Sequence, residues 1–360
     1  MSAVRLAQEV LEKTASPVQS IMVQVVMALV PATAFGLVLY GWPALYLFLS
    51  TVLSALLFEA LCLKLAGKPA SAFVGDGSAL LTGWLLAMSL PPWAPWWIGV
   101  AGSALAIVVG KQVYGGIGQN LFNPAMFARV ALLVSFPLEM TTWVKPTPPF
   151  TEFAPGLLDA LSITFGGVAP YDSVASPTLI GYTKTEFSQG RTLSELLATG
   201  NLGFLSALFG WMPGSLGETG SLLIAGGGAW LLRQKIITWQ IPAALLGTVA
   251  LLSTGFHFAD SEHYLSPWLH LTSGGVMLAA FFIATDYVTS PSSPNGQLIF
   301  GAGCGLIIFA IRTWGGFPEG VGFAVLLMNS LTPVIDYYVR PRIYGRDLKG
   351  RPLKLPENKP

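Results

Sequence analysis

Residues 14–58 decide the fold class of this 360-residue chain. They read TASPVQSIMVQVVMALVPATAFGLVLYGWPALYLFLSTVLSALLF, and these 45 residues contain no Asp, Glu, Lys or Arg. A helix that crosses ~30 Å of hydrocarbon needs about 20 apolar residues. The stretch therefore predicts two consecutive membrane helices, joined by a turn at Pro43, where a missing amide hydrogen costs least.

The composition of the whole chain agrees with this prediction. Hydrophobic residues make up 53% and charged residues 10%, whereas an ordinary soluble domain has about 25% charged residues. The apolar content excludes a disordered chain, and 19 basic against 18 acidic residues leave no net charge that would attract nucleic acid. Further charge-free runs cover residues 77–110, 236–259, 264–285 and 287–311. They lack the alternation typical of a transmembrane β-barrel, which indicates helices.

The sequence thus predicts an all-α polytopic membrane protein with about ten transmembrane helices. The expected ranges are 18–40, 43–63, 77–90, 95–110, 121–138, 220–232, 236–256, 266–285, 296–311 and 320–337. The third, fifth and sixth helices are short, which favours broken or half-crossing helices whose ends are buried in protein.

The chain also resembles itself at an offset of about 201 residues. AGSAL at 101–105 matches AGCGL at 302–306, Lys111 falls opposite Arg312, and a Gly-Gly pair follows each of them. Chance likeness between glycine-rich membrane helices is the alternative, but we favour a duplication. Five helices per half make the halves inverted, and inverted repeats commonly place a site at their interface. The expected organisation is segment 1–17, repeat 18–138, loop 139–219, repeat 220–337 and tail 338–360.

Orientation follows from the basic residues, which concentrate in cytoplasmic segments. With both termini in the cytoplasm, fourteen of the nineteen Lys and Arg residues lie inside, seven of them in the C-terminal tail. The loop 139–219 carries seven acids and three bases. We therefore expect both termini in the cytoplasm and this loop on the outside, which is the periplasmic face in a bacterial inner membrane.

Charged residues inside the membrane are the first candidates for function, because burying an ion in lipid is costly. Glu59, Asp76, Arg129 and Asp286 either line an ion route or contact a neighbouring subunit, or they sit at the headgroup boundary; the boundary is favoured for Asp76 and Asp286. Two other sets of residues, the histidines and the cysteines, do not indicate a functional site. His257, His263 and His270 lack the spacing of a known metal site, and Cys62 and Cys304 are interpreted as packing residues.

The loop 139–219 is long for this protein, and long loops usually have a task. It contains YDSVASPTLI at residues 171–180. Taken alone, this is a Ser/Thr/Pro turn in which no physical rule marks Thr178.

A resemblance to a known family provides information that these physical rules do not. The first half contains SALLTG (78–83), LPPWAPWW (90–97), GKQVYGG (110–116) and NPAM (123–126). The second half contains FFIATD (281–286), RTWGG (312–316), VGFAVLL (321–327) and DYY (336–338). With these motifs, nearly the whole chain resembles the NqrB/RnfD family, which comprises RnfD of the Rnf ion-translocating electron-transport complex and NqrB of the sodium-pumping NADH:quinone reductase.

The resemblance implies a flavoprotein. Family members carry FMN attached through its phosphate to a threonine in a signature like Asp-x-x-Ser/Thr-Gly-Ala-Thr. Matching by position places Asp172 on the aspartate and Thr178 on the acceptor threonine. Residues 175–177 (Ala-Ser-Pro) depart from the pattern, so Ser176 is the alternative acceptor. By analogy with NqrB, riboflavin is a candidate second, non-covalent flavin, whose residues the sequence does not place.

The resemblance also implies a role and partners. The expected role is an electron-carrying subunit of a ferredoxin:NAD⁺ oxidoreductase that translocates Na⁺ or H⁺. The expected partners are the other Rnf subunits (A, B, C, E and G), which supply the iron–sulfur and further flavin centres, together with membrane lipid. One alternative is a transporter or channel built on the inverted repeat with no redox role. Another is a scaffold protein of the complex that has lost its flavin.

Overall fold

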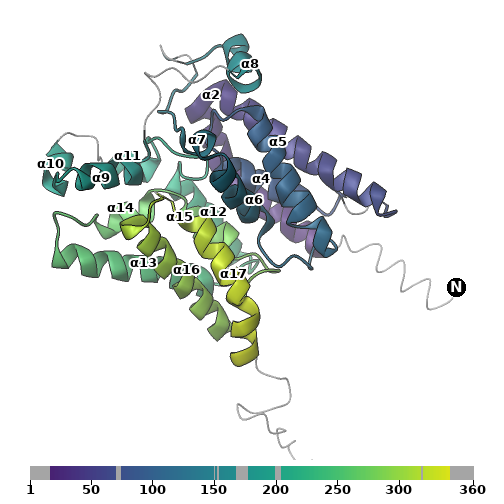
Figure 1. The fold of residues 1–360 in the computed structure, drawn as a ribbon. Coiled ribbons are helices and arrows are strands. Elements are labelled where there is room, and N and C mark those ends of the chain that lie inside the picture. The colour runs from purple at the N-terminus through teal and green to yellow at the C-terminus, as the bar shows by residue number, and fades with distance from the viewer. Residues whose placement is uncertain are drawn as a thin grey trace, which may run out of the picture.

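The chain folds as an all-helical bundle in the computed structural model, which describes residues 17–69, 74–149, 151, 154–167, 177–198, 204–317 and 319–340. Helices of the N-terminal half lie beside those of the C-terminal half (Figure 1). Of the short helices that connect the halves, α9, α10 and α11 lie together at the left of the view, whereas α8 lies apart from them at the top, near α2. The predicted segments 1–17 and 338–360 lie almost wholly outside the described residues.

The N-terminal half covers the ranges that were predicted for the first five helices. Its elements are α2 (Pro17–Leu65), α4 (Ser78–Ser89), α5 (Trp96–Ala104), the π-helical η1 (Leu105–Val109), the 3₁₀ turn η2 (Gln112–Tyr114) and α6 (Pro124–Ser135). The predicted pair 18–40 and 43–63 is one element, α2, that kinks at Gly41 with φ 72° and ψ −156°. Glycine reaches this conformation without the Cβ clash that other residues meet. The turn predicted at Pro43 therefore forms two residues earlier.

The C-terminal half covers the ranges that were predicted for the other five helices. Its elements are α12 (Ser221–Arg233), α13 (Gln240–Ala259), α14 (Pro267–Thr272), α15 (Val276–Leu278), the π-helical η3 (Ala279–Ile283), α16 (Pro294–Trp314) and α17 (Val321–Tyr338). The expected continuous helix 266–285 is broken between α14 and α15 at Gly274, where φ is +67°. As predicted, α4, α6 and α12 are short, with 12, 12 and 13 residues.

The described parts of the predicted loop 139–219 are also largely helical. They contain α7 (Pro137–Thr141), α8 (Leu157–Gly166), α9 (Leu179–Ser188), α10 (Leu193–Ala198) and α11 (Phe204–Phe209). A small apolar cluster, formed by Leu179, Ile180, Leu193, Leu196, Leu265 and Leu269, joins α9 and α10 to the start of α14. The helix that begins after Thr178 is thus packed onto the C-terminal half.

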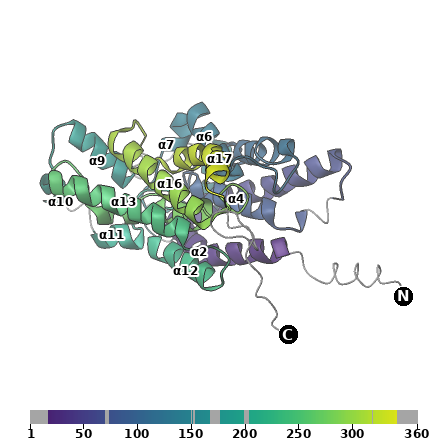
Figure 2. The ribbon, with the colours of Figure 1, turned by 90° about the horizontal axis from the view of Figure 1, so that it is seen from below.

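The two halves share one hydrophobic core. They meet where α12 packs on α2 and where α17 packs on α6, as the view from below shows (Figure 2). Asn329 of α17 stabilises the contact between α17 and α6. Its side-chain oxygen accepts from the Asn123 amide at 3.1 Å, and its Nδ2 donates to the Thr289 carbonyl at 3.0 Å. Five described helices are long and apolar enough to cross a bilayer, and four shorter ones are apolar. The protein is a multi-pass membrane protein.

Candidate functional sites

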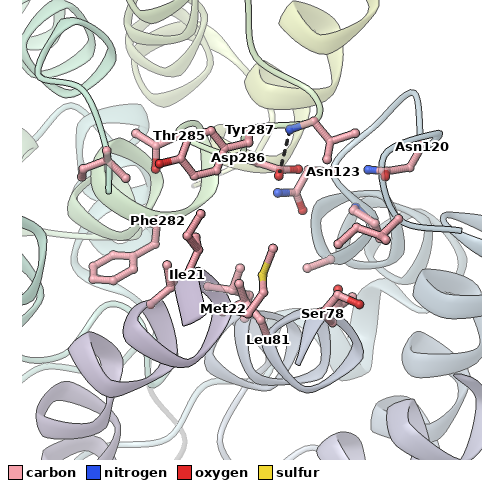
Figure 3. Close-up of a pocket in the computed structure, with 18 of the residues that line it drawn as sticks. Ile21, Met22, Ser78, Leu81, Asn120, Asn123, Phe282, Thr285, Asp286 and Tyr287 are labelled. Atoms are coloured by element: carbon pink, nitrogen blue, oxygen red, sulfur yellow. Dashed lines mark hydrogen bonds between the residues drawn. The ribbon is translucent and has the colours of Figure 1, made fainter. Parts of the chain in front are cut away.

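Two pockets of the bundle are lined by charged side chains. The first, called the Asn123 pocket, lies between the beginning of α2, α4, the end of η3 and the loop before α6 (Figure 3). Ser78, Asn123 and Asp286 line it from three different elements, while Met22 and Phe282 supply apolar walls. Its cavity volume is about 80 Å³.

A buried ion pair borders the Asn123 pocket. Lys111, which lines the pocket, donates from Nζ to Glu59 Oε1 at 2.8 Å and to Ser78 Oγ at 2.7 Å. Both charged side chains are almost fully buried, and Glu59 Oε2 has no hydrogen-bond partner among the described residues. Ser78 in turn donates to Asp76. A partly satisfied buried pair is costly to the fold, so its presence beside a pocket marks a candidate site.

The opposite side of the same pocket is built from the end of a π-helix. Asn123 caps α6 by accepting the Met126 amide hydrogen at 3.2 Å, and its Nδ2 donates to the Ile283 carbonyl at 3.4 Å. Asp286 accepts from the Val288 amide and, at 3.1 Å, from the Thr289 hydroxyl. π-helical turns are rare and frequent at functional sites. The Asn123 pocket therefore presents amide, hydroxyl and carboxylate groups against apolar walls.

The second pocket, called the Thr178 pocket, contains the predicted acceptor threonine. Thr178 is the N-cap of α9, its hydroxyl accepts the Gly181 amide hydrogen at 3.2 Å, and its side chain is buried. Glu218, Glu319 and Gly274 line the same pocket, whose cavity volume is about 20 Å³. That volume admits a water-sized group, so any larger group on Thr178 must extend beyond it.

A fully buried arginine organises one wall of the Thr178 pocket. Arg312 of α16 donates to Glu319 Oε1 at 2.6 Å, to the His270 carbonyl at 2.7 Å and to the Ser273 carbonyl at 3.0 Å. A Cβ on Gly274 would overlap Glu319 Oε1 and Arg312 Nη2. The break between α14 and α15 therefore exists where a buried ion pair fills the space that a side chain would need.

A lysine fastens the Thr178 helix to the same arginine-bearing helix. Lys184 of α9 donates from Nζ to the carbonyls of Ile311, Gly315 and Phe317 at 2.7, 2.9 and 2.9 Å. These carbonyls belong to the C-terminal end of α16 and the turn after it, where a helix dipole favours a cation. Burial and the nearby Arg312 charge lower the pKa of Lys184 to about 8, so it is protonated at neutral pH.

Glu218 lies in the loop that precedes α12 and is the second acid of the Thr178 pocket. Its Oε1 accepts from the Ser215 hydroxyl at 2.8 Å. Burial and the Glu319 carboxylate raise the pKa of Glu218 to about 7, while the charges of Arg129 and Arg312 oppose that rise. Arg129 itself has a buried Nη1 with no hydrogen-bond partner in the described part of the chain.

The structure brings some of the predicted residues together and leaves others apart. Glu59 borders the Asn123 pocket, whereas the Arg129 charge acts on Glu218 of the Thr178 pocket; Asp172 and Ser176 fall outside the described residues. The histidines have different surroundings: His257 contacts the Tyr264 carbonyl, His263 contacts Asp260, and His270 is buried. No group of three potential metal ligands occurs within the ranges that the structure describes.

Sequence reasoning missed Glu218, Glu319 and Lys184. The sequence does contain a signal for Glu218 and Glu319. Each is the only charged residue of an otherwise uncharged stretch, and each comes directly before an expected membrane helix. Lys184 had no such signal, since a lysine in a polar loop is ordinary.

The fold and its two pockets define a class: a multi-pass helical membrane protein whose broken and π-helical segments line sites that contain buried charges. A family profile described as the NQR2, RnfD, RnfE family matches residues 6–345. The chain therefore belongs to that family, which confirms the resemblance carried by the sequence motifs.

Individual relatives agree over nearly the full length. The chain is 55% identical over 338 residues to the D subunit of the ion-translocating oxidoreductase complex of Stutzerimonas stutzeri, covering 94% of this chain and 95% of that one. It is 52% identical over 341 residues to the corresponding protein of Halorhodospira halophila, covering 95% of each chain. The corresponding protein of Rhodobacter capsulatus is 52% identical over 291 residues, covering 81% of this chain and 80% of that one.

Proposed function

We propose that the protein is the D subunit of an ion-translocating oxidoreductase complex and carries electrons through FMN bound covalently to Thr178. The relatives that match the chain end to end are subunits of such a complex. The observation that carries the flavin proposal is the placement of Thr178 as the N-cap of α9, at a helix N-terminus of the kind that favours a phosphate group.

The residues present suit a phosphoester at this position. The first amide groups of a helix have no partner within the helix, and they favour a phosphate there. Around the pocket, Arg129, Lys184 and Arg312 supply three positive charges against the carboxylates of Glu218 and Glu319. The pocket itself is lined by the two carboxylates and, among the described residues, by no cationic side chain. A phosphate on Thr178 therefore has to turn away from Glu218 and Glu319, toward the first amide groups of α9. The flavin ring supplies the redox chemistry when bound, and it has to lie outside the small pocket.

The chain's own residues have distinct roles in this proposal. Thr178 holds the phosphate, and Lys184 keeps its helix fastened to the end of α16. Arg312 and Glu319 keep the pocket wall in place through their ion pair. Asp172 belongs to the attachment signature of the family that the motifs resemble.

The Asn123 pocket is the place we propose for a second, non-covalent flavin such as riboflavin. Its amide and hydroxyl groups match the hydrogen-bonding edge of a flavin, and Met22 and Phe282 offer apolar contact. The volume of about 80 Å³ is smaller than a three-ring flavin. Binding therefore requires the loop with Tyr287, or the start of α2, to move outward.

The wider assignment completes the proposal. The complex exchanges electrons between ferredoxin and NAD⁺ while it moves Na⁺ or H⁺ across a bacterial inner membrane, and the A, B, C, E and G subunits supply the iron–sulfur and other flavin centres. In this proposal both termini are cytoplasmic and residues 139–219 are periplasmic.

We also propose that the two halves are inverted repeats. In the first half Lys111 bonds the residue that follows Gly77, a glycine with φ of +80° at the start of α4. In the second half Arg312 bonds the residue that precedes Gly274, which has φ of +67° and lies before α15. A basic side chain near the end of a long helix thus supports the break before a short helix in both halves.

The test of the flavin proposal is the covalent fluorescence of the chain after co-expression with its complex. We expect a fluorescent band on a denaturing gel under ultraviolet light for the wild type and for Ser176→Ala, and none for Thr178→Ala. Peptide mass analysis then places flavin mononucleotide on Thr178. A Thr178→Ala band as bright as the wild type, or flavin found on Ser176, contradicts the assignment.

The same measurement separates the main alternative. A transporter or channel with no redox role shows no covalent fluorescence in any variant, although it has the same broken helices. The observation that favours this alternative is the buried ion pair beside each pocket, Lys111–Glu59 and Arg312–Glu319.

A further inference from the structure

We propose that α8 is an interfacial helix, which lies in the plane of the membrane with one apolar face against lipid acyl chains. The helix is Leu157–Gly166, in the segment between the two halves. It contributes no described residue to either pocket discussed above. This surface therefore goes beyond the proposed function and does not depend on a bound flavin.

The side chains of α8 divide into three faces. A helix has 3.6 residues per turn, so neighbours along the chain are about 100° apart around its axis. One face is buried against the protein and holds Ala160, Ile163 and Thr164. The next face is exposed and polar, with Asp159 and Ser162. The third face is exposed although it is apolar, and it consists of Leu157, Leu158, Leu161 and Phe165. An exposed apolar face of this kind marks a contact surface.

Aromatic contacts place α8 beside the ends of two membrane segments. The ring of Phe165 lies 6.3 Å from the Tyr46 ring of α2 and 6.2 Å from the Trp96 ring of α5, between centroids. Gly41, shortly before Tyr46, separates two parts of α2 that are each long enough to cross the hydrocarbon, and Trp96 is the first residue of α5. Tyr and Trp are enriched where membrane helices meet the headgroups. We therefore place α8, which lies near α2 (Figure 1), at that level.

The apolar face of α8 continues onto the outer surface of α2. After Tyr46, which Phe165 contacts, α2 exposes Leu49, Leu53 and Leu57 by 44%, 57% and 70%. Residues spaced by four lie on one side of a helix, so these leucines form a stripe. On a helix that is apolar enough to cross a bilayer, such a stripe suits lipid tails, which are as apolar as leucine. The same hydrocarbon is the partner that we assign to α8.

The charge of α8 favours acyl chains over lipid headgroups as the partner. Asp159 is the only charged residue of the helix, so α8 offers no basic group to an anionic headgroup. An interfacial helix rests with its apolar face at the boundary between headgroups and acyl chains and with its polar face toward water. The three faces of α8 match the three surroundings at that boundary, which are protein, hydrocarbon and water.

Spin labels on the full chain in phosphatidylcholine vesicles test this assignment. In a background with Cys62 and Cys304 replaced by alanine, a nitroxide is attached to Leu158→Cys or, as the matched control on the polar face, to Ser162→Cys. Both side chains are exposed, so neither substitution disturbs the core. Relaxation by oxygen, which concentrates in hydrocarbon, and by a water-soluble nickel chelate then reports the surroundings of each label.

We expect the label at position 158 to be relaxed several-fold more by oxygen than by the chelate, and the label at position 162 to show the reverse. Replacing part of the phosphatidylcholine with anionic phosphatidylglycerol should leave both ratios unchanged, because no basic residue of α8 is involved. Equal ratios at the two positions, or a ratio at position 158 that depends on anionic lipid, overturn the proposal.

The assembled complex separates lipid from a partner subunit as the occupant of this face. With p-benzoylphenylalanine in place of Leu158 in the co-expressed complex, irradiation should produce a lipid adduct on the peptide that contains position 158. The same group in place of Ser162 should produce none. A cross-link from position 158 to another protein, or no lipid adduct there, shows that acyl chains do not cover this face and contradicts the assignment.

Discussion

At the scale of single residues, the protein depends on charges that are buried in pairs. Removing one partner of such a pair typically costs 3–5 kcal/mol, because the other charge stays buried alone. Lys111–Glu59 and Arg312–Glu319 each join a long helix to a neighbouring segment. Both pairs lie beside a candidate pocket. We infer that the fold bears the desolvation cost of these pairs because the pockets require charges that are held in fixed positions.

Gly274 provides the residue-scale prediction. Replacement by alanine puts a Cβ on top of the Arg312–Glu319 pair and requires a positive φ, which costs an L-residue about 1–2 kcal/mol by itself. We expect Gly274→Ala to lower the free energy of unfolding by at least about 3 kcal/mol once the pair is displaced. The measurement is thermal or denaturant unfolding of the detergent-solubilised protein.

The neighbouring Gly275→Ala is the matched control. Its Cβ would meet only Val321, at 3.8 Å, and its φ is −78°. We expect it to unfold like the wild type. Equal losses of stability in the two variants would show that the break tolerates no side chain for a reason other than the ion pair.

At the scale of elements, α12 illustrates how a membrane helix packs through glycine. The run Gly226–Gly227–Gly228 has three different surroundings: open space at Gly226, the α2 backbone at Ala28 against Gly227, and the Phe281 ring, which a Cβ on Gly228 would overlap. Small residues let membrane helices approach closely. The contact of α12 with α2 and η3 thus depends on two of the three glycines.

This gives an element-scale prediction. Gly228→Ala overpacks α12 against Phe281, and overpacking usually costs about 1–3 kcal/mol. Gly226→Ala meets nothing within 4 Å and gains helix propensity, so its stability should be unchanged or higher. Unfolding temperatures of the two variants in detergent check this; a Gly226→Ala variant less stable than Gly228→Ala would contradict the packing of α12.

Much of the element level was predictable from the sequence. All ten expected ranges contain helix. Long apolar, charge-free runs are local properties of the sequence, and such runs form helices. The one wrong helix prediction falls where a tertiary contact overrides the local pattern: the helix expected over 266–285 breaks at Gly274, where Arg312 and Glu319 fill the space that a side chain would need. The short helices in the described parts of 139–219 were not predicted either way, and α9 and α10 pack on the start of α14.

At the scale of the whole molecule, the prediction concerns orientation. Bases concentrate on the side of the termini, so the end of α9 should face the periplasm and the end of α12 the cytoplasm. In a background with Cys62 and Cys304 replaced by alanine, we expect Ser188→Cys to react with a membrane-impermeant thiol reagent on intact cells. Gln234→Cys, which is also at an exposed position, should react only after permeabilisation.

The reverse labelling pattern would place Thr178 on the cytoplasmic side. The flavin at Thr178 would then lie on the face opposite to the one proposed, whatever the family membership. Labelling of both cysteines in intact cells would indicate leaky cells, which a soluble cytoplasmic thiol marker detects.

The amino-acid sequence alone determined the membrane class, the helical segments, the family and the candidate threonine. Hydrophobic length, charge partition and motif spacing are properties of short stretches, so they can be read without coordinates. Tertiary structure decided which charges meet. Glu59 and Lys111 are 52 positions apart, and Thr178, Glu218 and Glu319 come from three separate segments. Their energies depend on burial and mutual distance, which exist only once the helices have packed.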